Sequence, residues 1–105
     1  ASGNEFLDIK PIPKEFALHD NYPNPFNPLT TINYDLPKEG KVRLIIYDIM
    51  GREIAVLNNG FMPAGYHSVK WNARNQFGVE VSAGVYFYQI QAGQFSKTQK
   101  MILLK

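Results

Sequence analysis

Three prolines within six residues impose the strongest constraint on this chain. They lie in the segment Asn21-Tyr22-Pro23-Asn24-Pro25-Phe26-Asn27-Pro28. Each proline fixes its own φ, lacks a backbone N–H and pushes the preceding residue toward extended geometry. Neither a helix nor a central strand can contain such a segment, so we predict an ordered extended loop.

The other residues of this proline loop suit the same conformation. Asparagine side chains form hydrogen bonds with nearby backbone groups in turns, and Tyr22 and Phe26 carry enough apolar area to attach the loop to a neighbouring surface. We therefore expect a rigid connector between two strands. Recognition of a peptide by the loop is the alternative.

Composition indicates one domain with a packed core. The chain has 105 residues, of which 45% are hydrophobic and 13% aromatic, and it has no cysteine. This length is enough to bury a core without disulfides. Residues 1–15 contain Pro11 and Pro13 without a sustained period, so we interpret them as a linker or expression remnant and place the domain at residues 16–105.

Charge and hydropathy argue against two classes of partner. The 11 basic and 9 acidic residues give a net charge of +2, and the basic residues are scattered. Phosphate binding requires clustered cations, so no nucleic-acid partner is expected. No stretch approaches the roughly 20 apolar residues of a membrane helix, so no membrane insertion is expected either.

Alternating apolar and polar residues predict strands along the rest of the chain, and no helical period is present. Asp48 to Gly51 form a tight turn, residues 42–57 form a hairpin, and residues 58–60 end it. Together these signals predict an all-β fold, an immunoglobulin-like antiparallel β-sandwich of about seven strands, with a barrel as the alternative. The clearest predicted strands are residues 30–36, 42–47, 53–57, 66–71, 85–91 and 95–104.

Several motifs follow one another in a specific order. They are the proline loop, residues 30–32, residues 42–48, Gly51, Arg52, residues 65–67, Trp71, Gly78, Gly84, residues 85–88 with Tyr86, and residues 100–105. The series resembles the type IX secretion system type A C-terminal sorting domain of the Bacteroidetes and neighbouring phyla. It is also similar to the immunoglobulin-like domain of flagellar hook-capping proteins. Ala73 departs from the family pattern, which often has glycine there.

The resemblance implies a function. Such domains lie at the C-terminus of a secreted protein, are recognised by the outer-membrane export machinery, and are usually removed by a sortase-like protease that attaches the cargo to lipopolysaccharide. It therefore implies a non-catalytic module without a cofactor, joined to an N-terminal cargo domain. It also implies a secreted or outer-membrane surface location in a Gram-negative bacterium.

The chain end is the candidate sorting segment. It comprises Lys100, Met101, Ile102, Leu103, Leu104 and Lys105. It can dock as the final strand of the sandwich, or it can pair with a receptor by strand addition. We expect the proline loop to shape the sandwich and this segment to carry the sorting information.

Candidate catalytic and metal sites are weak. His67 and Ser68 are adjacent, but neighbouring strand residues point to opposite faces and cannot form a nucleophile and base pair. No other residues are spaced from His19 in a way that indicates a catalytic triad. Two sets of oxygen ligands could hold calcium, although neither has the spacing of a known calcium loop. These sets are Asp20, Asn21 and Asn24, and Asn72, Asn75 and Glu80.

Two further residue sets suggest other partners. Trp71, Tyr86, Phe87 and Tyr88 could stack on sugars, which would make this a polysaccharide-binding or structural accessory module of a larger extracellular enzyme. Alternation along the strand instead favours burial of Trp71 with either Tyr86 and Tyr88 or Val85 and Phe87. A basic face for an acidic partner could be formed by Arg43, Lys70, Lys97 and Lys100, although such residues also keep sheet edges soluble.

Overall fold

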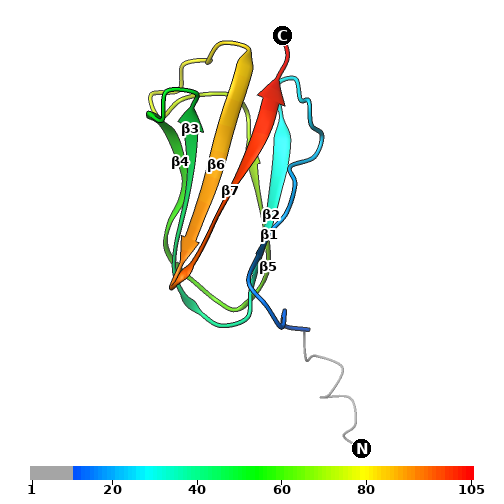
Figure 1. The fold of residues 1–105 in the computed structure, drawn as a ribbon, viewed down its shortest axis with the longest axis vertical. Helices are drawn as coiled ribbons and strands as arrows, with labels where there is room; N and C mark the ends of the chain where they lie inside the picture. Colours follow the sequence, from blue (N-terminus) through cyan, green and yellow to red (C-terminus); the bar gives the residue numbers. More distant parts are fainter. Residues whose placement is uncertain (1–10) are drawn as a thin grey trace, which may run out of the picture.

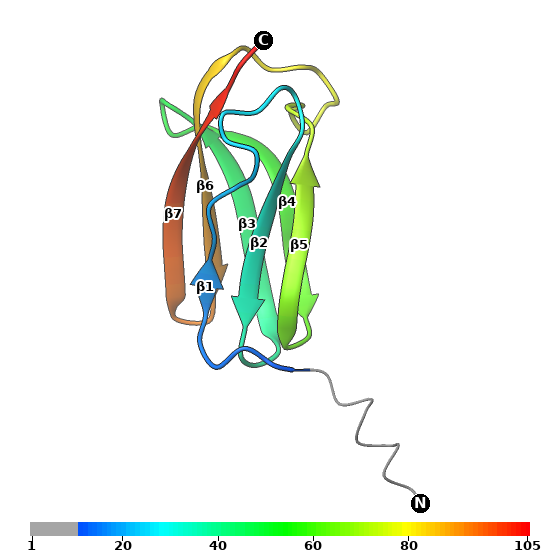
Figure 2. The ribbon, with the colours of Figure 1, turned by 90° about the vertical axis from the view of Figure 1, so that its right-hand side faces the viewer.

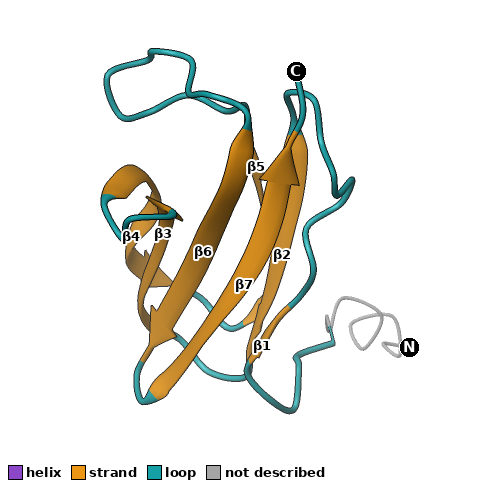
Figure 3. Ribbon diagram, turned by 45° about the horizontal axis from the view of Figure 1, so that its top comes forward, coloured by secondary structure: helices purple, strands orange, loops and turns teal. Residues whose placement is uncertain are grey.

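The computed structural model of the protein describes residues 11–105, and its regular structure in that range consists of strands. Seven strands form two antiparallel sheets that face each other (Figures 1 and 2). Figure 3 shows only strand and loop in this range. The predicted all-β sandwich is confirmed. The strands are β1 (Ala17–Leu18), β2 (Thr30–Leu36), β3 (Gly40–Asp48), β4 (Glu53–Met62), β5 (Gly65–Trp71), β6 (Gly84–Ala92) and β7 (Phe95–Leu103).

The smaller sheet has the strand order β1-β2-β5, and the larger has the order β4-β3-β6-β7. Alternation fixes which face of each strand is buried. In β2, Ile32, Tyr34 and Leu36 are buried whereas Asn33 is exposed, as the period-two pattern predicts. The two inner faces therefore share one core. Its buried members are Leu18, Phe26, Ile32, Tyr34, Leu36, Val42, Leu44, Ile46, Ala55, Trp71, Ala73, Tyr86, Tyr88, Ile90, Ala92, Met101 and Leu103.

Strand β4 is longer than predicted. The polar residues 58–60 were expected to end it, but it continues to Met62, paired with the first half of β3. Asn58 also donates a 2.7 Å hydrogen bond to the hydroxyl of Tyr34 in the opposite sheet. Backbone pairing and this bond override the local turn preference of Asn58-Asn59-Gly60.

Strand β1 was not predicted because two residues are too few to show a period. It pairs with β2 in the register Ala17↔Asp35 and Leu18↔Tyr34. Just before it, Phe16 stacks on Phe95 at a ring separation of 5.3 Å. The chain therefore packs against the sandwich before β1 begins, and Pro13, within the predicted linker, is also buried. The predicted linker lies partly outside the described residues, which begin at residue 11.

The hairpin turn between β3 and β4 is held by Asp48. Its carboxylate accepts hydrogen bonds from the backbone N–H groups of Met50 and Arg52 and from the Arg52 guanidinium. The bond from the Arg52 N–H is the main cause that holds the pKa of Asp48 below its usual value. Gly51 has φ of 84°, which glycine adopts without strain.

Tyr88 ties the four-stranded sheet to the segment after β1. It is fully buried, and its hydroxyl donates a 2.6 Å hydrogen bond to the carbonyl oxygen of His19. Burial raises the pKa of Tyr88 to about 12. The neutral phenol is therefore the form that the folded state favours.

This pKa predicts a loss of stability in alkali. The folded pKa lies above the unfolded value of about 10, so the contribution of Tyr88 is complete below that pH and falls as pH rises toward 12. Between pH 8 and pH 11 we expect it to fall by about 1.4 kcal/mol. The measurement is the free energy of unfolding in urea at both pH values.

The control is Tyr88→Phe, which removes the titrating group. Tyr34 and Tyr86, whose pKa values burial also raises, remain in both proteins. The difference between the two pH profiles therefore reports Tyr88 alone. Parallel profiles would contradict the assignment.

Candidate functional site

The proline loop connects β1 and β2 of the smaller sheet and on its way contacts β7 of the larger sheet. At its start, Tyr22 forms an antiparallel bridge with Thr31 of β2, and their backbone groups exchange two hydrogen bonds of 2.9 Å. Four residues later, Phe26 forms a parallel bridge with Leu103 of β7. Two prolines lie between these bridges, where no donor is needed for either ladder. Figure 2 shows this segment rising from β1 to the C-terminal end of β7.

Three hydrogen bonds join the loop to the last strand. The Phe26 N–H donates to the Ile102 carbonyl at 3.0 Å, and the Leu104 N–H donates to the Phe26 carbonyl at 2.8 Å. The Asn24 side-chain oxygen accepts from the Ile102 N–H at 3.0 Å. We call these four residues, Asn24, Phe26, Ile102 and Leu104, the terminal clamp. The proline loop and the candidate sorting segment are thus in direct contact.

The interior of the loop is held by a small polar network. The Asn21 side-chain amide donates to the Thr30 hydroxyl at 2.9 Å and to the Pro23 carbonyl at 3.2 Å. The Thr30 hydroxyl in turn donates to the Pro23 carbonyl at 2.9 Å. Asn21 and Thr30 are both buried. These bonds fix the position of Pro23 and hence the path of the chain toward Phe26.

Only one of the two predicted aromatic contacts exists. Phe26 is 1% exposed, and its ring centroid lies 5.7 Å from that of Trp71. Tyr22 is 79% exposed, so the expectation that it attaches the loop is wrong. Tyr22 is bridged to Thr31, whose neighbours Thr30 and Ile32 are buried, so Tyr22 lies with Thr31 on the outer face of the smaller sheet.

The aromatic contact continues into the core. Trp71 packs edge-on against Tyr86 at 5.5 Å, and its indole N–H donates to the Arg74 carbonyl at 2.9 Å. The Tyr86 hydroxyl donates to the Ser82 carbonyl at 2.6 Å. Phe26, Trp71 and Tyr86 therefore join the proline loop, β5 and β6, and they also hold both ends of the loop at residues 72–83.

The candidate sorting segment is docked as the final strand rather than free. Its inward side chains, Met101 and Leu103, are almost fully buried, whereas Lys100, Leu104 and Lys105 are exposed. The Lys105 ammonium lies 3.8 Å from Glu80, which also lies 3.5 Å from Arg74. The exposed part of the segment therefore lies beside the loop at residues 72–83.

The backbone of Ala73 has a conformation that is typical of glycine, the residue that the family pattern often has at this position. It has φ of 63° and is 1% exposed. Glycine adopts this left-handed conformation without strain, whereas a Cβ atom makes it less favourable. The backbone of this loop thus keeps a conformation that suits glycine, and burial of the Ala73 methyl group offsets part of the strain.

The histidines have structural partners. His67 stacks on Tyr34 at 5.2 Å, and its Nε2 lies 2.7 Å from the Pro63 carbonyl. Ser68 is exposed on the opposite face of β5, as predicted. His19 Nε2 lies 2.8 Å from the Asp35 carboxylate. Neither histidine is placed beside a nucleophile in these contacts.

The side-chain oxygens proposed as calcium ligands interact with other groups of the protein. Asn24 belongs to the terminal clamp, and the Asn75 side-chain oxygen accepts from the N–H groups of Phe77 and Val79. Glu80 pairs with Arg74 and Lys105. Among residues 11–105, no group of three or more histidine or acidic residues is arranged to hold a metal ion.

The aromatic set suggested for sugar binding is largely internal. Trp71, Tyr86 and Tyr88 are buried in the core, and Phe87 is half-buried on the outer face of β6.

The basic residues do not form one face. Lys70 belongs to the smaller sheet, and the alternation along β7 places Lys97 and Lys100 on opposite sides of the larger sheet. The remaining member, Arg43, pairs with Glu53.

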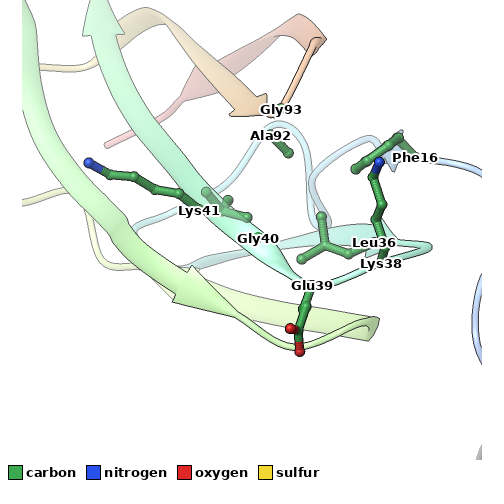
Figure 4. Close-up of a pocket in the computed structure, with 9 residues that line it drawn as sticks. Phe16, Leu36, Lys38, Glu39, Gly40, Lys41, Ala92 and Gly93 are labelled. Atoms are coloured by element: carbon green, nitrogen blue, oxygen red, sulfur yellow. The ribbon is translucent and has the colours of Figure 1, made fainter.

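An apolar hollow lies at the end of the sandwich opposite the terminal clamp. It has a volume of about 160 Å³ and is lined by Phe16, Leu36, Val42 and Ala92 together with the turn between β2 and β3 (Figure 4). Lys38, Glu39 and Lys41 surround it. No nucleophile and base pair lines it.

The described residues also include no helix that could cross a membrane.

A comparison with protein families matches residues 20–104 to the secretion system C-terminal sorting domain. The chain belongs to this family. The match includes the proline loop and ends at Leu104 of the terminal clamp. Membership gives the sorting domain a role in type IX secretion targeting and implies association with the secretion machinery. It also implies secretion to the cell surface or beyond, and the family is generally non-catalytic.

Two solved structures are similar to this sorting domain. One is PorZ of Porphyromonas gingivalis, an essential bacterial surface component of its type IX secretion system. The TM-score is 0.57 at 25% identity, over 86% of this chain and 11% of PorZ. The other is dimeric latent PorU of the same organism, with a TM-score of 0.65 at 20% identity, over 92% of this chain and 10% of PorU. The likeness to PorU shows the fold alone. A comparison with curated proteins gives no match.

The two aromatic residues of the loop provide a direct stability test. Phe26→Ala removes a buried ring that packs on Trp71, so we expect a loss of about 3–5 kcal/mol. Tyr22→Ala removes an exposed ring and should change stability by less than about 0.5 kcal/mol. Urea unfolding of both variants checks this. Equal losses would show that the loop packs differently.

Asn24 provides a second test. Asn24→Ala leaves the Ile102 N–H without its acceptor, and we expect a cost of about 0.5–1.5 kcal/mol and faster exchange of the Ile102 amide hydrogen. Asn24→Asp keeps an oxygen at this position and is the matched control. Hydrogen exchange followed by NMR measures both. Unchanged Ile102 exchange in Asn24→Ala would exclude this bond from the clamp.

Proposed function

We propose that the domain is a non-catalytic module that directs a cargo protein, joined to its N-terminal side, through the type IX secretion system. Its partners are the outer-membrane secretion machinery and the sortase-like protease that processes the cargo. The destination is the cell surface of a Gram-negative bacterium. Family membership supports this proposal, and the similarity to PorZ, itself a surface component of such a system, agrees with it.

The terminal clamp is the observation that carries the proposal. It makes one surface from the first motif of the family pattern and the last residues of the chain. Recognition therefore uses a folded strand end rather than a loose peptide. The side chains available to a receptor are Lys100, Leu104 and Lys105, because Met101 and Leu103 are buried. Ile102, which is partly exposed, adds apolar area beside them.

The direction of the chain suits attachment of a cargo. The described chain starts near the end of the sandwich that carries the β2–β3 turn, and its C-terminus lies at the other end (Figures 1 and 2). We propose that residues 1–15 act as a linker and residues 16–105 as the sorting domain. A cargo joined through this linker leaves the clamped end accessible to the secretion machinery.

No observation favours the polysaccharide-binding or structural accessory role. That role needs two exposed aromatic rings in one plane, and three of the four aromatic residues suggested for it are buried. Their burial is explained by packing between the two sheets. We therefore propose the sorting role alone.

Export of a reporter tests the proposal. The full 105-residue chain is fused to the C-terminus of a periplasmic reporter and expressed in a host with a working type IX system. We expect the reporter at the cell surface or in the medium. Retention of the wild-type fusion in the periplasm would overturn the proposal.

A pair of double variants tests the recognition surface. Lys100→Ala with Lys105→Ala removes two exposed charges at the clamped end, and we expect export to fall at least about fivefold while the melting temperature shifts by less than about 3 °C. Lys38→Ala with Lys41→Ala removes the same charge at the opposite end and should leave export unchanged. Equal export by both variants would exclude the lysines of the clamped end from recognition.

A further inference from the structure

β7 is the last strand of the larger sheet, and one of its edges is paired along its whole length. Its residues pair with β6 from Gly84↔Leu103 to Ala92↔Phe95. In an antiparallel pair, alternate residues direct both their N–H and C=O groups to the same edge. Ile102 directs both groups to the outer edge, because its N–H donates to Asn24 and its carbonyl accepts from Phe26. Ser96, Thr98 and Lys100, which have the same parity as Ile102, therefore also direct their backbone groups outward.

The terminal clamp covers only the end of this outer edge. Within residues 11–105, no backbone hydrogen bond is formed at the outer edge by Ser96, Thr98 or Lys100. β1 of the smaller sheet lies beside β7 and is joined to it by a side-chain bond, in which the Gln99 amide donates to the Leu18 carbonyl at 3.1 Å. A row of three N–H and three C=O groups is thus open for pairing with another strand.

The charged side chains beside the outer edge of β7 determine which kind of strand can pair with it. Lys97 and Lys100 are exposed, and neither belongs to an ion pair among the described residues. They project from opposite faces of the sheet, one on each side of the open edge. A second copy of the edge would bring four lysines along one short ladder, and like charges there are unfavourable. An acidic strand would meet both lysines with opposite charge.

We infer that the outer edge of β7, from Ser96 to Lys100, binds an extended acidic segment of a partner protein by strand addition. Backbone pairing over about five residues, or roughly 16 Å, supplies affinity. Carboxylates on both faces of the segment supply selectivity, one face meeting Lys97 and the other Lys100. The inference rests on the proposed function in taking the partner from the export route, but the binding itself is measured without export.

The test uses two synthetic peptides of about ten residues as probes. One repeats Glu-Glu-Thr, so that carboxylates lie on both faces of the extended peptide, and the other repeats Lys-Lys-Thr. NMR of the full chain follows amide exchange during titration. We expect the acidic peptide to slow exchange of the Ser96, Thr98 and Lys100 amides at least about fivefold, and the basic peptide to leave them unchanged. Absence of protection by the acidic peptide, or protection confined to β1, β4 or β5, would overturn the inference.

Variants of Thr98 separate backbone pairing from side-chain effects. Thr98→Pro removes an outward N–H and costs no backbone bond to β6, although it loses the bond from the Gln89 side chain to the Thr98 hydroxyl. We expect it to weaken binding of the acidic peptide at least about tenfold. Thr98→Val also loses the hydroxyl but keeps the N–H, so its affinity should stay within about twofold of wild type. Equal binding by the two variants would overturn the inference.

Charge reversal keeps the inference testable if Thr98→Pro fails to fold. Lys97→Glu with Lys100→Glu should reverse the preference, so that the basic peptide protects the edge and the acidic peptide does not. An unchanged preference would overturn the inference. If the acidic peptide binds but the reporter is not exported, the proposed function is overturned and the edge site stays in place. If the reporter is exported but the peptide does not bind, the edge site is overturned and the proposed function stays in place.

Discussion

The hydrogen bonds between Phe26 and the end of β7 are the interaction on which the rest of the structure depends. They join a segment near the start of the domain to its last strand, across most of the chain length. Phe26 then packs on Trp71, which packs on Tyr86, so this single residue links both sheets and the loop at residues 72–83. Without the last strand, Phe26 has no backbone partner and the core loses Met101 and Leu103. The sandwich is therefore complete only when the final residues of the chain are in place.

This dependence gives a sorting domain a physical property that suits its role. We propose that residues 100–105 carry the sorting information, and these residues reach their docked form only when the domain has folded around them. Exposed residues of the terminal segment then have fixed positions, with Lys105 near Glu80 and the Ile102 backbone bound to Asn24 and Phe26. A receptor that recognises this arrangement distinguishes a folded domain from an unfolded chain with the same sequence. The energetic basis is preorganisation, because less conformational entropy is lost on binding.

The two edges of β7 have different chemistry for the same geometric reason. The backbone groups of the inner edge are paired with β6, whereas among residues 11–105 those of the outer edge are paired only where the proline loop reaches it. The prolines account for this short reach, since they lack donors and cannot extend a ladder. The lysines beside the uncovered part discourage pairing with like-charged strands, including other copies of the domain. The proline loop therefore covers the strand end and leaves the middle of the strand open to an acidic partner.

Local sequence alone determined the fold class and most strands, because alternation depends only on neighbouring residues. Thr30–Leu36 was predicted with its observed bounds, and Gly51 was placed correctly in a turn. Sequence also indicated that residues 21–28 form neither a helix nor a central strand. The length of β4, the existence of β1 and the exposure of Tyr22 depended on partners distant in sequence. Asn24 appeared as a possible calcium ligand, and only the tertiary structure showed that it binds Ile102. Backbone pairing over such separations leaves no local pattern, so only the folded chain decided that the proline loop and the candidate sorting segment lie in direct contact.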